Sequence, residues 1–213
     1  MTVVNKKLDP GQLFLQNRSM AKALQKRTLE TRARLIAAAE AVIAESGYEA
    51  MRVEEVVLRA GTAKGTFFAH FKDKDALMDM IIGARLDSYL DELEAAENPT
   101  TVEALAEALM PLCDFMTSER YVFDLILRYS GAAAIEAIGP IAVNFGRQVE
   151  LFERWGNAAR FRSDIGVDLQ AEGIHAFMIQ AMATHFCALH NAQSINDRLV
   201  PYLRAWLAPV GQV

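Results

Sequence analysis

The sequence predicts an all-α fold, in which a small N-terminal helical unit precedes a larger helical bundle. Three observations predict it. Apolar residues recur every three or four positions along most of the 213 residues, and no segment alternates as a strand would. Glycine, proline and short polar stretches interrupt this pattern where helices would end. The hydrophobic content of 52% is sufficient for a sizeable core.

Charge is divided unequally along the chain. Residues 18–74 contain eleven Lys and Arg against seven Asp and Glu, a net charge of +4. Residues 75–213 contain nine against nineteen, a net charge of −10. The basic segment favours a polyanionic partner, and the acidic remainder does not. The sequence contains no run of eighteen apolar residues and no apolar leader after its first lysines, so we expect no membrane span and no secretion signal.

The two cysteines, Cys113 and Cys187, match no metal or redox spacing. We therefore expect a reduced, cytoplasmic protein that needs no metal and no cofactor.

The N-terminal elements follow from caps and spacing. Residues 1–26 are predicted to form a mobile basic arm with helical character near its end. Thr28 is the expected N-cap of the first helix, and Gly47 its left-handed stop. Short helices are predicted over 53–60 and 63–70, with Gly61 between them. The expected inward-facing residues are Leu35, Ile36, Ala39, Val42, Ile43, Val53, Val56 and Val57.

A longer fourth helix is predicted after "KDK", with Asp73 as its N-cap. Its expected apolar side consists of Leu77, Met80, Ile81, Ala84, Leu90 and Leu93. Further helices are predicted near 100–117, 119–135, 140–160, 168–191 and 195–208. This organisation indicates a helix-turn-helix domain over residues 27–74 and a second domain over residues 75–213.

The stretch "GTAKGTFFAHF", residues 61–71, combines features that neither a core helix nor a loop requires. Phe67 and Phe71 are four positions apart and share one helix face, so both are expected in the core. Gly65 lets the backbone approach a partner closely, and Lys64 adds a charge at the start of the helix. Two short helices with a tight turn form a helix-turn-helix, whose second helix enters the DNA major groove.

Residues 28–77 resemble the DNA-binding domain of the tetracycline-repressor (TetR) family of bacterial transcription regulators. The stretch "RVEEVVLRAGTAKGTFFAHFKDKDAL", residues 52–77, carries the resemblance. The resemblance covers about a quarter of the chain and implies a homodimer that binds double-stranded operator DNA. Its two recognition helices would lie about 35 Å apart in successive major grooves. The family pattern also implies release by a small apolar or amphipathic effector bound in the second domain.

The family pattern implies DNA contacts residue by residue. Base contacts are expected from Lys64, Gly65, Thr66 and Ala69, and phosphate contacts from Arg52, Thr66, Phe68, His70, Lys72 and Lys74. Two positions depart from the pattern. Phe68 replaces the usual tyrosine and cannot donate a hydrogen bond to a phosphate. Ala63 cannot cap the third helix, which leaves Thr62 as the candidate cap.

The second domain is expected to bind the effector and to dimerise through the helices at 168–191 and 195–208. The run "HAFMIQAMATHFCALH", 175–190, is richer in Met, Phe and His than a minimal core requires. Candidate effector contacts are Leu112, Phe115, Met116, Tyr121, Phe145, Gln148, Phe152, His175, Met178 and Met182. The alternative is that these residues serve only in packing.

Other interpretations stay open at this stage. Lys64, Arg52, Lys72 and Lys74 could be solvated surface charges, and His70 could only cap its helix. Arg18, Lys22, Lys26 and Arg27 could contact DNA or belong to a disordered tail. A helical carrier or enzyme without a DNA role is an alternative function, as is a regulator that answers a protein partner. Glu172 with His175 lacks the second copy a di-iron site needs, and His185, Cys187 and His190 do not converge on one helix face.

Overall fold

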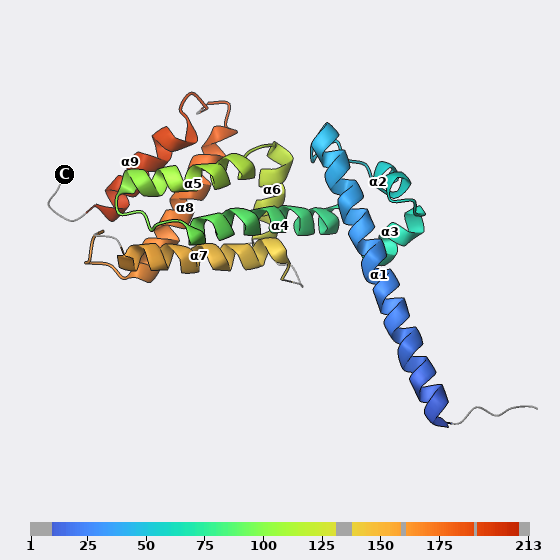
Figure 1. The fold of residues 1–213 in the computed structure, drawn as a ribbon. Coiled ribbons are helices and arrows are strands. Elements are labelled where there is room, and N and C mark those ends of the chain that lie inside the picture. The colour runs from blue at the N-terminus through green and yellow to red at the C-terminus, as the bar shows by residue number, and fades with distance from the viewer. Residues whose placement is uncertain (1–9, 131–137, 159–160, 190, 209–213) are drawn as a thin grey trace, which may run out of the picture. The chain divides into compact units, whose positions relative to one another are not determined.

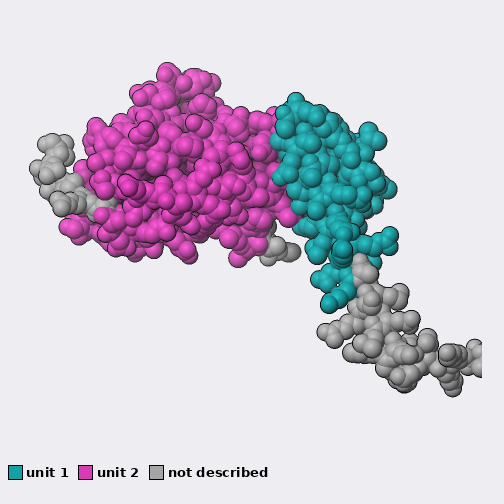
Figure 2. Space-filling model, in the orientation of Figure 1, with its two compact units in different colours: residues 1–46, 50–72 teal, residues 47–49, 73–213 magenta. Residues whose placement is uncertain are grey.

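The computed structural model describes residues 10–130, 138–158, 161–189 and 191–208, and within these residues every regular element is an α-helix. Figure 1 shows the order of the helices along the chain. They fall into two compact units, which Figure 2 colours separately. Unit 1 comprises residues 1–46 and 50–72, and unit 2 comprises residues 47–49 and 73–213. The all-α fold with an N-terminal helix-turn-helix is as the sequence predicts.

Unit 1 contains α1 (Pro10–Ser46), α2 (Val53–Arg59) and α3 (Lys64–His70). Its core is built from the expected face of α1 and from the two aromatic residues, with Leu35, Ala39, Val42, Val56, Val57, Phe67 and Phe71 all buried. Arg32 fastens the end of α3 to α1, because its guanidinium donates to the carbonyl oxygen of His70 at 3.1 Å and lies over the Phe71 ring.

The prediction that the first helix begins at Thr28 is wrong, since α1 begins at Pro10. The intervening residues are mostly Leu, Gln, Ala, Lys, Arg and Met, which favour helix. The Thr28 hydroxyl donates to the carbonyl oxygen of Leu24 within the helix and caps nothing. Proline is also well suited to the first position of a helix, where its missing N–H costs no hydrogen bond.

Three other predicted helix boundaries, at Gly47, Gly61 and Asp73, follow their signals. Gly47 and Gly61 adopt positive φ angles of 87° and 61°, as left-handed helix stops require. The Asp73 side chain accepts a hydrogen bond from the Ala76 N–H at 2.8 Å and caps α4 (Lys74–Ala95). Asp73 and Lys74 therefore belong to unit 2, where the chain leaves the helix-turn-helix.

Unit 2 continues with α5 (Val102–Met116), α6 (Arg120–Tyr129), α7 (Pro140–Ala158), α8 (Val167–His185) and α9 (Ile195–Leu207). Helix α7 packs against both α4 and α8, and α9 packs against α5 and α8. The buried face of α4 includes Met78, Ile82 and Leu86, which the sequence pattern did not single out, whereas Ala84 is exposed. No described helix has both the length and the apolar character needed to cross a bilayer.

Helix α8 ends earlier than predicted. It stops at His185 and not near residue 191. In its last turn the Thr184 hydroxyl donates to the carbonyl oxygens of Gln180 and Ala181. His190, once considered as a metal ligand, lies outside the described residues. So do the first nine residues of the predicted arm and residues 131–135 of the predicted sixth helix.

Candidate nucleic-acid interface and effector site

Helix α3 starts without a side-chain cap. Ala63 occupies the N-cap position, and no side chain bonds the first turn of the helix. Thr62 was the candidate cap, but its hydroxyl is buried and has no hydrogen-bond partner. The Thr62 backbone N–H instead donates to the Val57 carbonyl oxygen at 2.9 Å, which closes the turn after α2. The first N–H groups of α3 are therefore left without a side-chain acceptor.

The two sides of α3 differ sharply in burial. Phe67 is 0% exposed, and its ring centroid lies 5.5 Å from that of Phe71. On the other side, Gly65 and Ala69 are exposed and Phe68 is 49% exposed. A Cβ atom built on Gly65 would meet no atom within 4 Å. The outer face of α3 therefore carries the small residues Gly65 and Ala69, so a partner can approach the helix backbone closely there.

Lys64 stands at the start of this face and forms an ion pair. Its ammonium donates to the Glu54 carboxylate of α2 at 2.6 Å, and both side chains are more than half exposed. The hydrogen bond from Lys64 holds the pKa of Glu54 below its usual value. Such exposed pairs contribute little stability, so Lys64 can exchange Glu54 for another anion at small cost.

The other predicted DNA contacts are placed differently from one another. Arg52 and Lys72 are exposed, whereas Thr66 and His70 are partly buried. Lys74 turns its ammonium to the loop between α1 and α2, where the carbonyl oxygens of Tyr48 and Glu49 accept at 3.0 and 2.9 Å.

The same loop is held a second time, because the backbone N–H groups of Tyr48 and Glu49 donate to the Glu119 carboxylate at 2.8 and 2.9 Å. Lys74 and Glu119 therefore fix this loop to unit 2.

Several predicted effector contacts meet between α7 and α8. The His175 ring lies 4.8 Å from that of Phe145 and 6.5 Å from that of Phe152, measured between centroids. Gln148 is on the same face of α7 as these two phenylalanines and is 0% exposed. Met178 and Met182 are buried on α8, and Leu112 and Met116 on α5.

Two predicted effector contacts interact with other parts of unit 2. Phe115 packs its ring against those of Tyr48 and Tyr89, at 6.3 and 5.5 Å between centroids. The Tyr121 hydroxyl donates to the Asp75 carboxylate at 2.9 Å, while the Lys74 ammonium lies over its ring. The sequence pattern could not separate these two residues from the group around His175.

The interior of unit 2 contains polar atoms without partners. Neither the amide nitrogen nor the amide oxygen of Gln148 has a hydrogen bond, and Nε2 of His175 has none. Burial lowers the pKa of His175, which favours the neutral ring. Trp155 also leaves its indole N–H unpartnered, although it is 1% exposed. Sequence reasoning missed Trp155, although its spacing from Phe152 places both on one face of α7.

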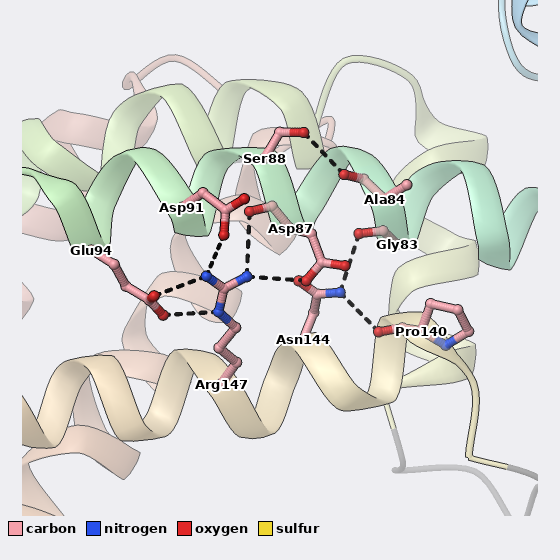
Figure 3. Close-up of polar contacts among 9 residues, drawn as sticks. All are labelled: Gly83, Ala84, Asp87, Ser88, Asp91, Glu94, Pro140, Asn144 and Arg147. Atoms are coloured by element: carbon pink, nitrogen blue, oxygen red, sulfur yellow. Dashed lines mark hydrogen bonds and ion pairs between the residues drawn. The ribbon is translucent and has the colours of Figure 1, made fainter.

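The outer side of α7 is clamped to α4 by Arg147, as Figure 3 shows. Its guanidinium donates to the carboxylates of Glu94 at 2.8 and 2.9 Å, Asp91 at 2.5 Å and Asp87 at 3.2 Å. The hydrogen bond from Arg147 lowers the pKa of Glu94. One turn earlier, the Asn144 side-chain amide donates to the carbonyl oxygens of Gly83 and Pro140.

A surface hollow of about 480 Å³ lies apart from these residues. It is lined by Met110, Asp114, Thr117, His185, Ser194, Ile195 and Asn196, none of which the sequence singled out for an effector. Burial raises the pKa of Cys113 to about 12, which makes its thiol a poor nucleophile. In the part of the chain that the structure describes, no three His, Cys, Asp or Glu side chains group as metal ligands.

One family model and several known proteins are similar to this chain. Residues 35–81 match the family model described as bacterial regulatory proteins, tetR family, and these residues include α2 and α3. The helix-turn-helix segment of this chain is therefore similar to the DNA-binding domain of the tetR family. One curated relative is the uncharacterised HTH-type transcriptional regulator YvdT of Bacillus subtilis, 33% identical over 102 residues. The match covers 47% of this chain and about half of the relative, 52% of its length.

Solved structures resemble this chain over most of its length. FadR of Thermus thermophilus, solved with lauroyl-CoA, has a TM-score of 0.61 at 16% identity and covers 82% of this chain and 92% of its own. RolR, solved with resorcinol, also has a TM-score of 0.61, at 22% identity, and covers 85% and 90%. At these identities the likeness concerns the fold.

Proposed function

We propose that this chain is a DNA-binding transcriptional regulator, a homodimeric repressor that a small, largely apolar effector releases from a palindromic operator. The observation that carries the proposal is the outer face of α3, where Gly65 leaves the backbone open beside Lys64. An exposed glycine in a helix costs stability, so a close approach by a partner is a reason for its presence. The family match over the helix-turn-helix supports DNA as that partner.

The proposed division of roles follows the family pattern, with one change at Lys74. Lys64, Gly65, Thr66 and Ala69 read base edges, and Arg52, Phe68, His70 and Lys72 face the backbone of the DNA. Lys74, which the sequence assigned to phosphate, holds the loop at Tyr48 and Glu49 in the DNA-free protein. We therefore expect Lys74 to contribute less to DNA affinity than Lys72.

The proposed dimer uses the exposed side of α8. Ala176, Gln180 and Ala183 are exposed at helical spacing. The small side chains of Ala176 and Ala183 permit a second helix to approach closely. A twofold pair of chains would place two copies of α3 one turn of DNA apart, about 34–36 Å, on a palindromic site.

The proposed release mechanism runs through α7. The solved relatives FadR and RolR were crystallised with lauroyl-CoA and resorcinol, which supports an effector in unit 2 here. The face of α7 that carries Phe145, Gln148 and Phe152 would receive it. The opposite side of α7 holds α4 through Arg147, and α4 follows the helix-turn-helix in the chain. A shift of α7 would therefore also move α4, the helix that directly follows α3 in the chain.

A selection from genomic DNA tests the proposed function. Purified protein is mixed with sheared genomic fragments at moderate salt, and the bound fragments are sequenced. We expect sharp enrichment of a few palindromic sites. Even recovery of all fragments, falling smoothly with salt, would reveal only non-specific charge. That result would refute the regulator proposal in favour of a carrier or an enzyme.

Two glycine substitutions then test the contact surface itself. Gly65→Ala and Gly146→Ala each add a methyl group to an exposed helix position where no atom lies within 4 Å. Both should stabilise the fold by about 0.5–1 kcal/mol, since alanine favours helix over glycine. Only Gly65→Ala should weaken operator binding, by about 10- to 100-fold, the size of one lost base contact. Equal operator binding by both variants would show that Gly65 does not face the DNA.

A further inference from the structure

The interior between α7 and α8 contains an amide whose hydrogen-bonding capacity is entirely unused. Gln148 is 0% exposed, and neither its nitrogen nor its oxygen has a partner. A buried amide without hydrogen bonds is costly, and a leucine or methionine would fill the same place without that cost. The residue therefore calls for an explanation beyond packing.

A second buried group without a hydrogen-bond partner lies on α8, at His175. Its neighbours on the same face of α7, Phe145 and Phe152, both contact the His175 ring of α8. Gln148 is between them in the helix, so its amide and the unpartnered Nε2 of His175 belong to the same layer of the core. Met178, one turn further along α8, is apolar and fully buried.

We propose that Gln148 and His175 form a recognition subsite for one uncharged hydrogen-bonding group, a hydroxyl or a carbonyl, on an otherwise apolar effector. This proposal rests on the proposed function, because it names the chemical class of the effector that unit 2 binds. Gln148 offers both a donor and an acceptor to such a group, and Nε2 of His175 offers one or the other according to its tautomer. The phenylalanine rings on either side would cover the apolar part of the molecule.

The surroundings select against a charged effector. The charged side chains of α7 and α8 closest in sequence to this pair are turned away, since Glu150, Arg154 and Glu172 are exposed and Arg147 binds the acids of α4. Burial lowers the pKa of His175 and so keeps its ring neutral. A carboxylate or an ammonium in this layer would be desolvated without a counter-ion, which is strongly unfavourable. Hydrogen-bonding groups without net charge are the chemistry that this layer accepts.

The test measures binding of three probes that share a propylphenyl body. These are 4-propylphenol, 4-propyltoluene and the 4-propylbenzoate anion, each titrated against the full chain without DNA, with the melting temperature as the readout. We expect the wild type to prefer the phenol over the toluene by about tenfold in affinity, the value of one net hydrogen bond. The anion should give no shift.

Two variants locate the preference. Gln148→Met keeps the side-chain volume, so it should bind both neutral probes with nearly equal affinity, and without ligand it should melt at a higher temperature than the wild type. Gln25→Met makes the same chemical change at an exposed position of α1 and should keep the tenfold preference.

Three results would overturn the proposal. The wild type could bind the phenol and the toluene with equal affinity, or Gln148→Met could keep the full preference for the phenol. The third result is that neither neutral probe changes the melting temperature of the wild type at millimolar concentration. Each leaves the genomic DNA selection unaffected, so failure of the subsite can be told apart from failure of the proposed regulator.

Discussion

The contact between α4 and α7 depends on a glycine, and replacing it gives a sharp prediction. A Cβ atom on Gly83 would lie 2.4 Å from Cβ of Pro140 and 3.2 Å from the Pro140 carbonyl carbon. One of these neighbours is backbone, so the clash cannot be relieved by turning a side chain. Gly83→Ala should therefore push α7 away from α4 and disturb the hydrogen bond that Asn144 donates to the Gly83 carbonyl oxygen.

The size of the effect follows from two opposing contributions. Overpacking a well-filled contact costs about 1–3 kcal/mol. Alanine in place of glycine inside a helix returns about 0.5–1 kcal/mol. Gly83→Ala should thus lower the free energy of unfolding by about 0.5–2 kcal/mol. Gly146→Ala on α7, where a Cβ meets nothing within 4 Å, should raise it by about 0.5–1 kcal/mol.

The chain provides a reporter for this measurement. Both tryptophans, Trp155 and Trp206, lie in unit 2, so their fluorescence follows the unfolding of that unit in urea. The two glycine variants should shift the midpoint in opposite directions relative to the wild type. A Gly83→Ala midpoint at or above that of the wild type would refute the inferred close approach of α4 and α7.

Three further predictions concern other parts of the molecule. Phe67→Ala should destabilise unit 1 by about 3–5 kcal/mol, seen by circular dichroism, whereas the half-exposed Phe68→Ala should cost less than about 1 kcal/mol; equal losses would contradict the burial of Phe67 alone. Lys64→Ala should lower operator affinity more than non-specific affinity, while Lys72→Ala should lower both and reduce the salt slope by about one; a uniform loss from Lys64→Ala would exclude base reading. The lowered pKa of His175 means that its stability contribution is complete above the unfolded value of 6.5 and is lost as the pH falls through the folded value; urea unfolding at pH 7.5 and pH 5 should show a smaller loss in His175→Leu than in the wild type.

The sequence predicted the local features of the fold because they depend on neighbouring residues. Gly47, Gly61 and Asp73 end or begin helices as expected, since each acts on the backbone within one turn. Thr28 was misread because its capping chemistry also suits a helix interior, where its hydroxyl bonds the preceding turn. A helix start therefore needs a break in propensity as well as a capping residue.

Contacts between helices were less accessible from the sequence. Asp87, Asp91 and Glu94 share one face of α4 by their spacing, but nothing in the sequence identifies Arg147 as their common partner. Lys74 has the same local signature as a phosphate-binding lysine, yet its ammonium is taken by two carbonyl oxygens of a distant loop. These pairings depend on tertiary packing, which a single sequence does not encode in its spacing.

Two adjacent residues of α7, Arg147 and Gln148, lie on different sides of the helix. The energy of the Arg147 ion pairs is similar to the coupling free energy that the proposed mechanism requires. Arg147 holds α4 through three carboxylates, while Gln148 is fully buried on the face of α7 that carries Phe145 and Phe152. Arg147 is 24% exposed and its partners are more exposed, so each ion pair is worth about 0.2–1 kcal/mol. Coupling between effector and DNA typically needs about 1–3 kcal/mol. Three weak ion pairs together are of that size. In the proposed mechanism, a ligand that prefers a displaced α7 by this amount would release α4, whereas one buried salt bridge of several kcal/mol would hold α4 in place.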